Sequence, residues 1–162
     1  MSGEIIYPLN QMKSIFPEIY EAQFKKYDWR PEIPVQRIPQ LNCLWNDVVF
    51  LFATHPSVVS EALVESELNP LIHSYYEIPL DRLDMNNLSV KRWTRDNEGY
   101  HEFWEEFDIS KFDFYQKLDE GTRQYFEDCK NSLAQRLLVY LTVPHILYKG
   151  TINVSGLNII KP

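Results

Sequence analysis

The sequence predicts an α+β fold, a single domain over residues 1–162 with a mixed or mainly antiparallel sheet and helices packed against it. Three observations support this prediction. The segment Asp47–Ala53 is an unbroken run of β-branched and aromatic residues, which indicates a central strand covered on both faces. Apolar residues recur at helical spacing in residues 10–27, 56–67 and 121–141. Short strand-like segments punctuated by glycine and proline account for much of the remainder.

The first 44 residues combine a short strand, a bent helix and a long loop. Residues 4–7 have strand composition and stop at Pro8, which cannot continue a ladder. We expect helix over most of residues 10–27, with a bend at Pro17, because proline suits the first position of a second helical segment. Residues 28–44 contain three prolines, so an extended, irregular backbone is expected, and long loops of this kind are often functional.

The helix at residues 56–67 is expected to start directly after the central strand. Thr54 or His55 can cap its first turn, and Pro56 fits the first helical position. The middle of the chain then predicts strands at residues 74–78 and 88–93, one helical turn at 79–83 and a turn at 96–99. Residues 100–107 fit a strand or a helix, and we favour the strand.

The C-terminal region opens with the clearest helical pattern. In residues 121–141 an apolar side chain recurs every four residues, which predicts a helix packed on the sheet. The residues that make this pattern are Tyr125, Cys129, Leu133, Leu137 and Leu141. Pro144 breaks it, and residues 145–150, 151–154 and 157–160 predict short closing strands.

Composition and charge restrict the classes of function. The net charge of −7, from 23 acidic and 16 basic residues, disfavours binding to nucleic acid or anionic membranes. No apolar run approaches the roughly 18 residues of a membrane span, and the N-terminus lacks the pattern of a signal peptide. Cys43 and Cys129 belong to no metal-binding motif, and we expect free thiols in a cytoplasmic protein.

Several common catalytic motifs are absent. The five glycines are scattered, so neither a P-loop nor a dinucleotide-binding fingerprint can be matched. The sequence contains no HExxH and no GxSxG, and its four histidines are isolated from one another, so no metal site is predicted. Catalytic residues therefore stay unassigned.

The cluster Trp45–Asn46–Asp47 is the most notable candidate for a binding site. It places an aromatic ring, an amide and a carboxylate where the long loop enters the central strand, and clefts often form at such a position. A purely structural role, with Trp45 in the core and the other two holding the turn, is the alternative that we favour. His55, at the other end of the strand, is expected to start a helix rather than to act as a base.

Two further segments carry aromatic and acidic residues. Tyr76 and Glu77 lie on a predicted strand and could face a cleft, although alternation along a strand places one side chain inward and the next outward. Residues 98–108 contain paired carboxylates, for which we favour a solvated charged edge over acid–base chemistry.

The order of features resembles that of small ADP-ribosyltransferase-like toxin domains. The resemblance rests on Ile5–Pro8, on the strand-to-helix passage Val48–Ser57 and on Tyr76–Leu80, and it is one of order and not of motif. No catalytic residue is carried over, because no early His or Arg and no late Glu matches the pattern of such domains. The resemblance implies an enzyme that binds nicotinamide dinucleotide (NAD) in a cleft beside the central strand and transfers ADP-ribose.

Two hypotheses follow. In the first, Arg37 pairs with the pyrophosphate of the dinucleotide, and Trp45, Tyr76 and Glu77 share its pocket. In the second, the chain is a non-catalytic immunity, inhibitor or adaptor protein that holds a protein partner through the acidic and aromatic surface of residues 100–114. The residues alone leave open whether the chain is an enzyme.

Overall fold

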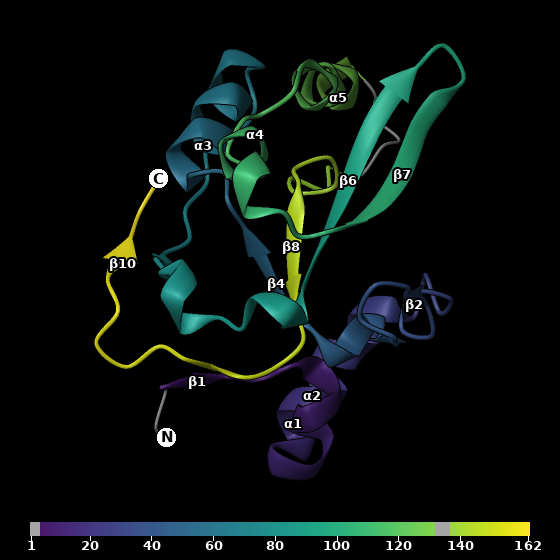
Figure 1. Cartoon of the computed structure of the whole chain (residues 1–162). Helices are drawn as coiled ribbons and strands as arrows, with labels where there is room; N and C mark the ends of the chain where they lie inside the picture. The colour runs from purple at the N-terminus through teal and green to yellow at the C-terminus, as the bar shows by residue number, and fades with distance from the viewer. Residues whose placement is uncertain (1–3, 132–136) are drawn as a thin grey trace.

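The main sheet is antiparallel, with the strand order β4, β8, β6, β7. A computed structural model describes residues 4–131 and 137–162. In Figure 1 the sheet runs through the middle of the molecule, with α1 and α2 on one side of the view and α3 and α5 on the other. The strands are β4 (Val49–Phe52), β6 (Leu88–Asp96), β7 (Gly99–Glu106) and β8 (His145–Tyr148). The predicted α+β class, the mainly antiparallel sheet and the strand at residues 100–107 are confirmed.

The strand predicted at residues 47–53 is present as β4, but the prediction that it is central was wrong. β4 lies at one end of the sheet, and β8 and β6 take the inner positions. The apolar run reflects burial of both faces rather than pairing of both edges. Leu51 packs on one hydrophobic cluster, whereas Phe50 and Phe52 pack on two others.

Three antiparallel pairs of two-residue strands lie outside the main sheet, in the terminal segments, the middle of the chain and the long loop. The pairs are β1 (Ile5–Ile6) with β9 (Ile152–Asn153), β5 (Tyr75–Tyr76) with β10 (Ile159–Ile160), and β2 (Arg37–Ile38) with β3 (Cys43–Leu44). The strand predictions for these N-terminal, middle and C-terminal segments are confirmed. The loop at residues 28–44 is irregular as predicted, apart from the small β2–β3 hairpin.

The helices of the first half follow their sequence signals. α1 (Leu9–Ile15) and α2 (Pro17–Phe24) meet at the predicted bend, with Pro17 at the first position of α2. α3 (Pro56–Glu65) follows the cap residue His55, whose ring Nδ1 accepts from the Ser57 N–H at 3.2 Å. Shorter elements are η1 (Lys25–Tyr27), η2 (Trp45–Asp47), η3 (Leu80–Arg82), η4 (Met85–Asn87), η5 (Ile109–Lys111) and α4 (Phe112–Tyr115).

The helix predicted at residues 121–141 is shorter than expected. It forms α5 (Glu120–Asn131), while residues 132–136 lie outside the described part of the chain. Residues 137–144 are not helical, so the prediction is wrong there.

Burial of the apolar side chains after α5 explains this error. Leu137, Val139 and Leu141 pack against the buried residues of α3 and α5, but they do so from a turn. The Tyr125 hydroxyl accepts from the Leu138 N–H at 3.0 Å and holds that turn against the helix. In this segment, apolar residues spaced four apart therefore indicated buried side chains but not a helix.

Candidate ligand-binding site

A cavity of about 730 Å³ lies against one face of the sheet. Its walls come from η1 and the following loop, from β4, β6, β7 and β8, and from the turn before β8; in Figure 1 the part of this loop that contains β2 lies below β7. Aromatic rings form much of the lining, and they belong to Tyr27, Trp29, Trp45, Phe50, Trp93 and Tyr140. The polar side chains that join them include Lys26, Arg30, Gln36, Lys91, Glu102 and His145.

Strand alternation places the polar residues of the sheet on the cavity side. Lys91 and Trp93 are two residues apart on β6, so their side chains share a face. Trp104 pairs across from Lys91, and Glu102 pairs across from Trp93. His145 of β8 pairs with Lys91 on its other side. The register of three strands therefore brings these five side chains to one face of the sheet.

The Lys91 ammonium is enclosed by indole rings. The residue is 5% exposed, and its Nζ lies 4.4, 5.1 and 5.3 Å from the ring centroids of Trp45, Trp93 and Trp104. Each contact favours the charged form of the lysine. The Glu102 carboxylate, 3.1 Å from Nζ, is its anionic partner.

Glu102 is held through both of its oxygens. Oε2 faces Lys91, and Oε1 accepts from the Gln36 side-chain amide at 3.1 Å. Gln36 is itself anchored, because its backbone carbonyl accepts from the Trp45 N–H at 2.8 Å. Burial lowers the pKa of Lys91, while the Glu102 carboxylate acts against that shift and the Arg30 charge adds to it.

His145 is a neutral imidazole at pH 7. Burial, together with the positive charge of Lys91, lowers the pKa of His145 to about 4. Its Nδ1 lies 2.8 Å from the Val143 carbonyl oxygen, which can only accept, so Nδ1 carries the proton and Nε2 keeps its lone pair. The site thus combines an amine, a carboxylate and an uncharged imidazole.

Three polar atoms of the lining are buried without a hydrogen-bond partner among the described residues. They are Arg30 Nε, Gln36 Oε1 and Trp93 Nε1, which are two donors and one acceptor. Arg30 stacks on Trp29, with its guanidinium carbon 4.2 Å from the ring centroid. No carboxylate of the described residues forms an ion pair with Arg30. Because an unsatisfied buried polar group is costly, a partner for any of these three atoms would stabilise the structure.

The predicted cluster Trp45–Asn46–Asp47 divides between site and scaffold. Trp45 lines the cavity. Asn46 is buried and accepts from the Tyr27 hydroxyl at 2.8 Å. Asp47 accepts from the Asn10 amide at 2.7 Å and from the Leu44 N–H at 2.8 Å, so it fixes the loop within the chain.

The other predicted site residues lie elsewhere. Arg37 is exposed and its guanidinium donates to the Asn42 side chain at 2.5 Å. His55, Tyr76 and Glu77 line a second cavity of about 670 Å³ on the side of β4 and β5. The structure therefore does not bring Arg37, Trp45, Tyr76 and Glu77 into one pocket.

Most residues of this cavity were not among the predicted site residues. Neither Arg30 nor Lys91 was selected as a site residue, and Glu102 falls within residues 98–108, for which a solvated charged edge was expected, whereas all three line the cavity. A signal was available: a charged residue and a tryptophan stand two positions apart on each strand of the β6–β7 hairpin.

Within residues 4–131 and 137–162, no group of three or more His, Cys, Asp or Glu side chains could hold a metal ion, and Cys43 and Cys129 are free and buried. No helix of the described chain has both the length and the apolar character needed to cross a bilayer. Comparisons of the sequence with protein-family models and curated proteins, and of the fold with solved structures, give no match.

Proposed function

We propose that this chain binds a small ligand with a flat ring and an anionic group in the tryptophan-lined cavity. Nicotinamide dinucleotide, the ligand that the sequence resemblance implies, is one member of this class. The observation that carries the proposal is the set of unpartnered buried atoms, Arg30 Nε, Gln36 Oε1 and Trp93 Nε1, among aromatic rings.

The aromatic lining suits a flat ring. Each aromatic contact contributes about 0.5–1.5 kcal/mol beyond the area it buries. A ring that carries a carboxamide would offer both a donor and an acceptor, which are the groups that Gln36 Oε1 and Trp93 Nε1 lack. Nicotinamide carries such a group, and several nucleobases offer a donor and an acceptor through an amide within the ring.

The charges of the lining suit an anion. Lys26, Arg30 and Lys91 outnumber the carboxylates of Glu32 and Glu102, although the whole chain carries a net charge of −7. Lys91 is already paired with Glu102, so Arg30 is the cation placed to meet a phosphate or carboxylate of the ligand.

Thermal melting with a panel of ligands tests the proposal. The panel contains the dinucleotide, adenosine monophosphate, nicotinamide and inorganic phosphate. At ten times its Kd, a ligand should stabilise the fold by about 1.4 kcal/mol and raise the melting temperature accordingly. No shift with any of them at millimolar concentration would contradict the proposal.

Matched variants locate the binding. Trp93→Phe removes the unpartnered indole N–H of a residue in the cavity lining, and we expect about a tenfold weaker Kd, corresponding to about 1.4 kcal/mol. Trp104→Phe makes the same change on a residue outside the lining, keeps an aromatic ring beside Lys91, and should weaken Kd by less than about twofold. Arg30→Gln should weaken anionic ligands selectively, whereas Arg37→Gln should not. Equal effects within either pair would contradict this placement.

Transfer of ADP-ribose is the more specific form of the proposal. It rests on the sequence resemblance together with the aromatic lining and the cations of the cavity, which suit the nicotinamide ring and the pyrophosphate of NAD. Its test is mass spectrometry for ADP-ribose attached to protein or nucleic acid after incubation with the dinucleotide and cell extract. Binding of the dinucleotide without transfer of ADP-ribose would contradict the enzymatic activity, and the proposal of a ligand-binding protein would stand.

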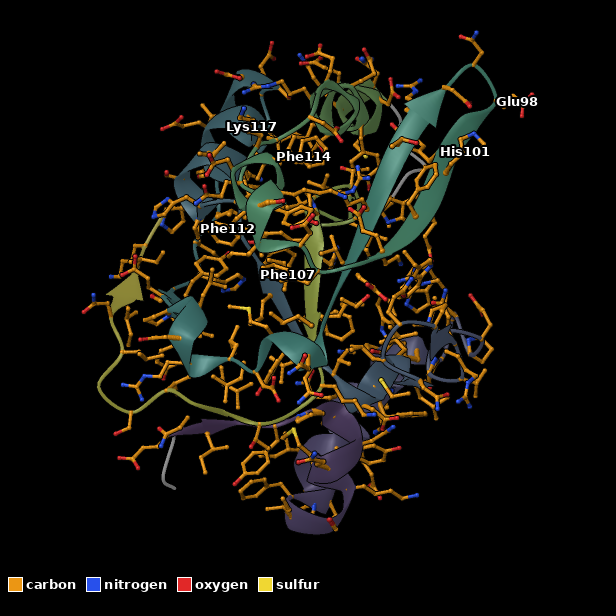
Figure 2. All side chains as sticks on the ribbon, in the orientation of Figure 1. Glu98, His101, Phe107, Phe112, Phe114 and Lys117 are labelled. Atoms are coloured by element: carbon orange, nitrogen blue, oxygen red, sulfur yellow. The ribbon has the colours of Figure 1, made fainter. Side chains whose placement is uncertain are left out.

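The partner-binding alternative has one observation in its favour. Phe103, Ile109 and Phe114, all within residues 100–114, are about half exposed. Glu102 and Glu105, however, are paired with cations of this chain, which leaves less charge to attract a basic partner. Figure 2 also shows Glu98 and His101 at the tip of the hairpin, well away from Phe112 and Phe114. Purification from the native cell at low salt tests this alternative. A protein that purifies as a monomer without any partner would contradict it.

A further inference from the structure

Lys91 is unusual among the residues of the cavity because it combines burial, a single anionic partner and access to the ligand space. It is 5% exposed, yet it lies in the cavity lining. Among the described residues, Glu102 is its sole ion-pair partner, at 3.1 Å. A lysine ammonium has three N–H donors, so the lysine retains donors that the protein does not satisfy.

We infer that Lys91 forms a reversible imine with an aldehyde or ketone group of the ligand, with Glu102 moving the protons. This inference rests on the proposed function, since it requires a ligand in the same cavity. It narrows the ligand class to flat, anionic molecules that also carry a reactive carbonyl group.

The reaction balances with the groups that the site holds. Glu102 takes a proton from the Lys91 ammonium, and the neutral amine attacks the carbonyl carbon while the C=O π electrons move to oxygen. A proton then moves from nitrogen to that oxygen and gives a carbinolamine. The protonated Glu102 delivers its proton to the hydroxyl group, the C–O bond breaks, and water leaves. The products are a protonated imine on Lys91, a Glu102 carboxylate and one water molecule.

The surroundings of Lys91 favour both the first and the last step of this reaction. Burial lowers the pKa of Lys91, which eases formation of the neutral amine. The protonated imine has the same charge as the ammonium it replaces. It therefore keeps the ion pair with Glu102 and the contacts with the faces of Trp45, Trp93 and Trp104.

Glu102 is placed to move protons because the protein fixes its orientation. Its second oxygen accepts from Gln36, which directs the first oxygen at Lys91. His145 pairs with Lys91 across the sheet and is uncharged at pH 7, so it adds no second positive charge beside the amine.

Pyridoxal 5′-phosphate is a suitable probe because it carries a flat ring, a phosphate and an aldehyde. The 162-residue chain is incubated with a substoichiometric amount of the probe, reduced with borohydride and digested, and the adducts are mapped by mass spectrometry. We expect the reduced adduct mainly on Lys91, at least tenfold above each exposed lysine such as Lys149. Adducts spread evenly over the lysines, or absent from Lys91, would overturn the inference.

Two variants test the roles of the residues. Glu102→Gln keeps the size of the side chain and an oxygen near Lys91 but cannot take up a proton, and the adduct on Lys91 should form at least tenfold more slowly. Gln116→Glu, which changes a side chain in the other cavity, is the control and should leave the rate unchanged. An unchanged rate in Glu102→Gln would overturn the role of Glu102. Lys91→Met should lose the specific adduct, and its melting curve checks that it folds.

Pyridoxine 5′-phosphate separates this inference from the proposed function. It has the same ring and phosphate but an alcohol in place of the aldehyde, so it can bind and cannot form an imine. Binding of pyridoxine phosphate without a Lys91 adduct from the aldehyde would overturn the imine and leave the proposed function intact. Failure of both probes and of the nucleotide panel would overturn both.

Discussion

At the scale of single residues, His145 shows how the cavity controls charge. Its ring lies against Phe50 and Phe52, with centroid separations of 6.2 and 5.0 Å, and it faces the Lys91 cation across the sheet. Both surroundings disfavour a second positive charge, which explains why the pKa of His145 falls to about 4. The neutral ring is therefore part of the folded state at physiological pH.

The shift predicts a pH dependence of stability. Well above the unfolded pKa of about 6.5 the histidine is neutral in both folded and unfolded chains, so it contributes no pH dependence there. As the pH falls toward 4, this histidine becomes protonated in the unfolded chain but stays largely neutral in the folded chain. The free energy of unfolding should therefore drop by up to about 3 kcal/mol from this residue.

Urea denaturation between pH 7 and pH 4 measures this drop. His145→Asn keeps a donor for the Val143 carbonyl but cannot titrate, so it should lose less stability than the wild type over this range. His73→Asn changes an exposed histidine and should keep the wild-type profile. Parallel profiles for His145→Asn and the wild type would contradict a neutral His145.

Asp47 is the residue whose role the structure changes most. Its carboxylate joins Asn10 of α1 to the Leu44 backbone, and Asp47 is not among the residues that line the cavity. Asp47→Ala should lower the free energy of unfolding by about 2 kcal/mol, because it removes two hydrogen bonds to a charged group. Ligand affinity of the folded variant should stay within twofold of the wild type. Normal stability with lost binding would contradict this scaffold role.

At the scale of elements, the turn after α5 depends on one hydroxyl group. Tyr125 is buried, and burial raises its pKa to about 12, so the hydroxyl stays protonated at physiological pH. It accepts from Leu138, whose neighbours Val139, Tyr140 and Leu141 form one wall of the cavity. The tyrosine thus couples α5 to the ligand site.

Tyr125→Phe tests this coupling. The variant leaves the Leu138 N–H without its acceptor, so the free energy of unfolding should fall by about 1 kcal/mol, and ligand affinity should weaken because the wall loses an anchor. Tyr76→Phe removes an exposed hydroxyl and should change neither quantity. Urea denaturation and fluorescence titration measure both. An effect of the same size in Tyr76→Phe would contradict the assignment.

The β6–β7 hairpin shows what could have been predicted. Strands at residues 88–93 and 100–107 and a turn at 96–99 follow from composition, and counting outward from that turn gives Lys91 opposite Trp104 and Trp93 opposite Glu102. The cluster around Lys91 was therefore partly readable in the sequence. The place of β8 beside β6 was not, because a four-residue strand of His145 and three apolar residues carries no information about which strand it will join.

At the scale of the whole molecule, the cavity depends on contacts between distant segments. The loop at residues 28–44 supplies Trp29, Arg30 and Gln36, and the sheet supplies the floor. Its irregular backbone was predicted from its prolines, but the direction in which it folds over the sheet is set by tertiary contacts such as Gln36 with Glu102. Local patterns do not encode such contacts, which is why Arg37 was chosen from this loop in place of Arg30.

The central claim is that a flat, anionic ligand occupies the tryptophan-lined cavity. The chain has four tryptophans, so a ¹H–¹⁵N NMR spectrum contains four indole N–H signals, assignable with single Trp→Phe variants. The protein is titrated with the dinucleotide, or with the panel ligand that raises its melting temperature most. The Trp93 signal should move most, the Trp29 and Trp45 signals less, and the Trp104 signal least. Saturable binding that leaves the Trp93 signal in place, or that moves Trp104 alone, would contradict the account.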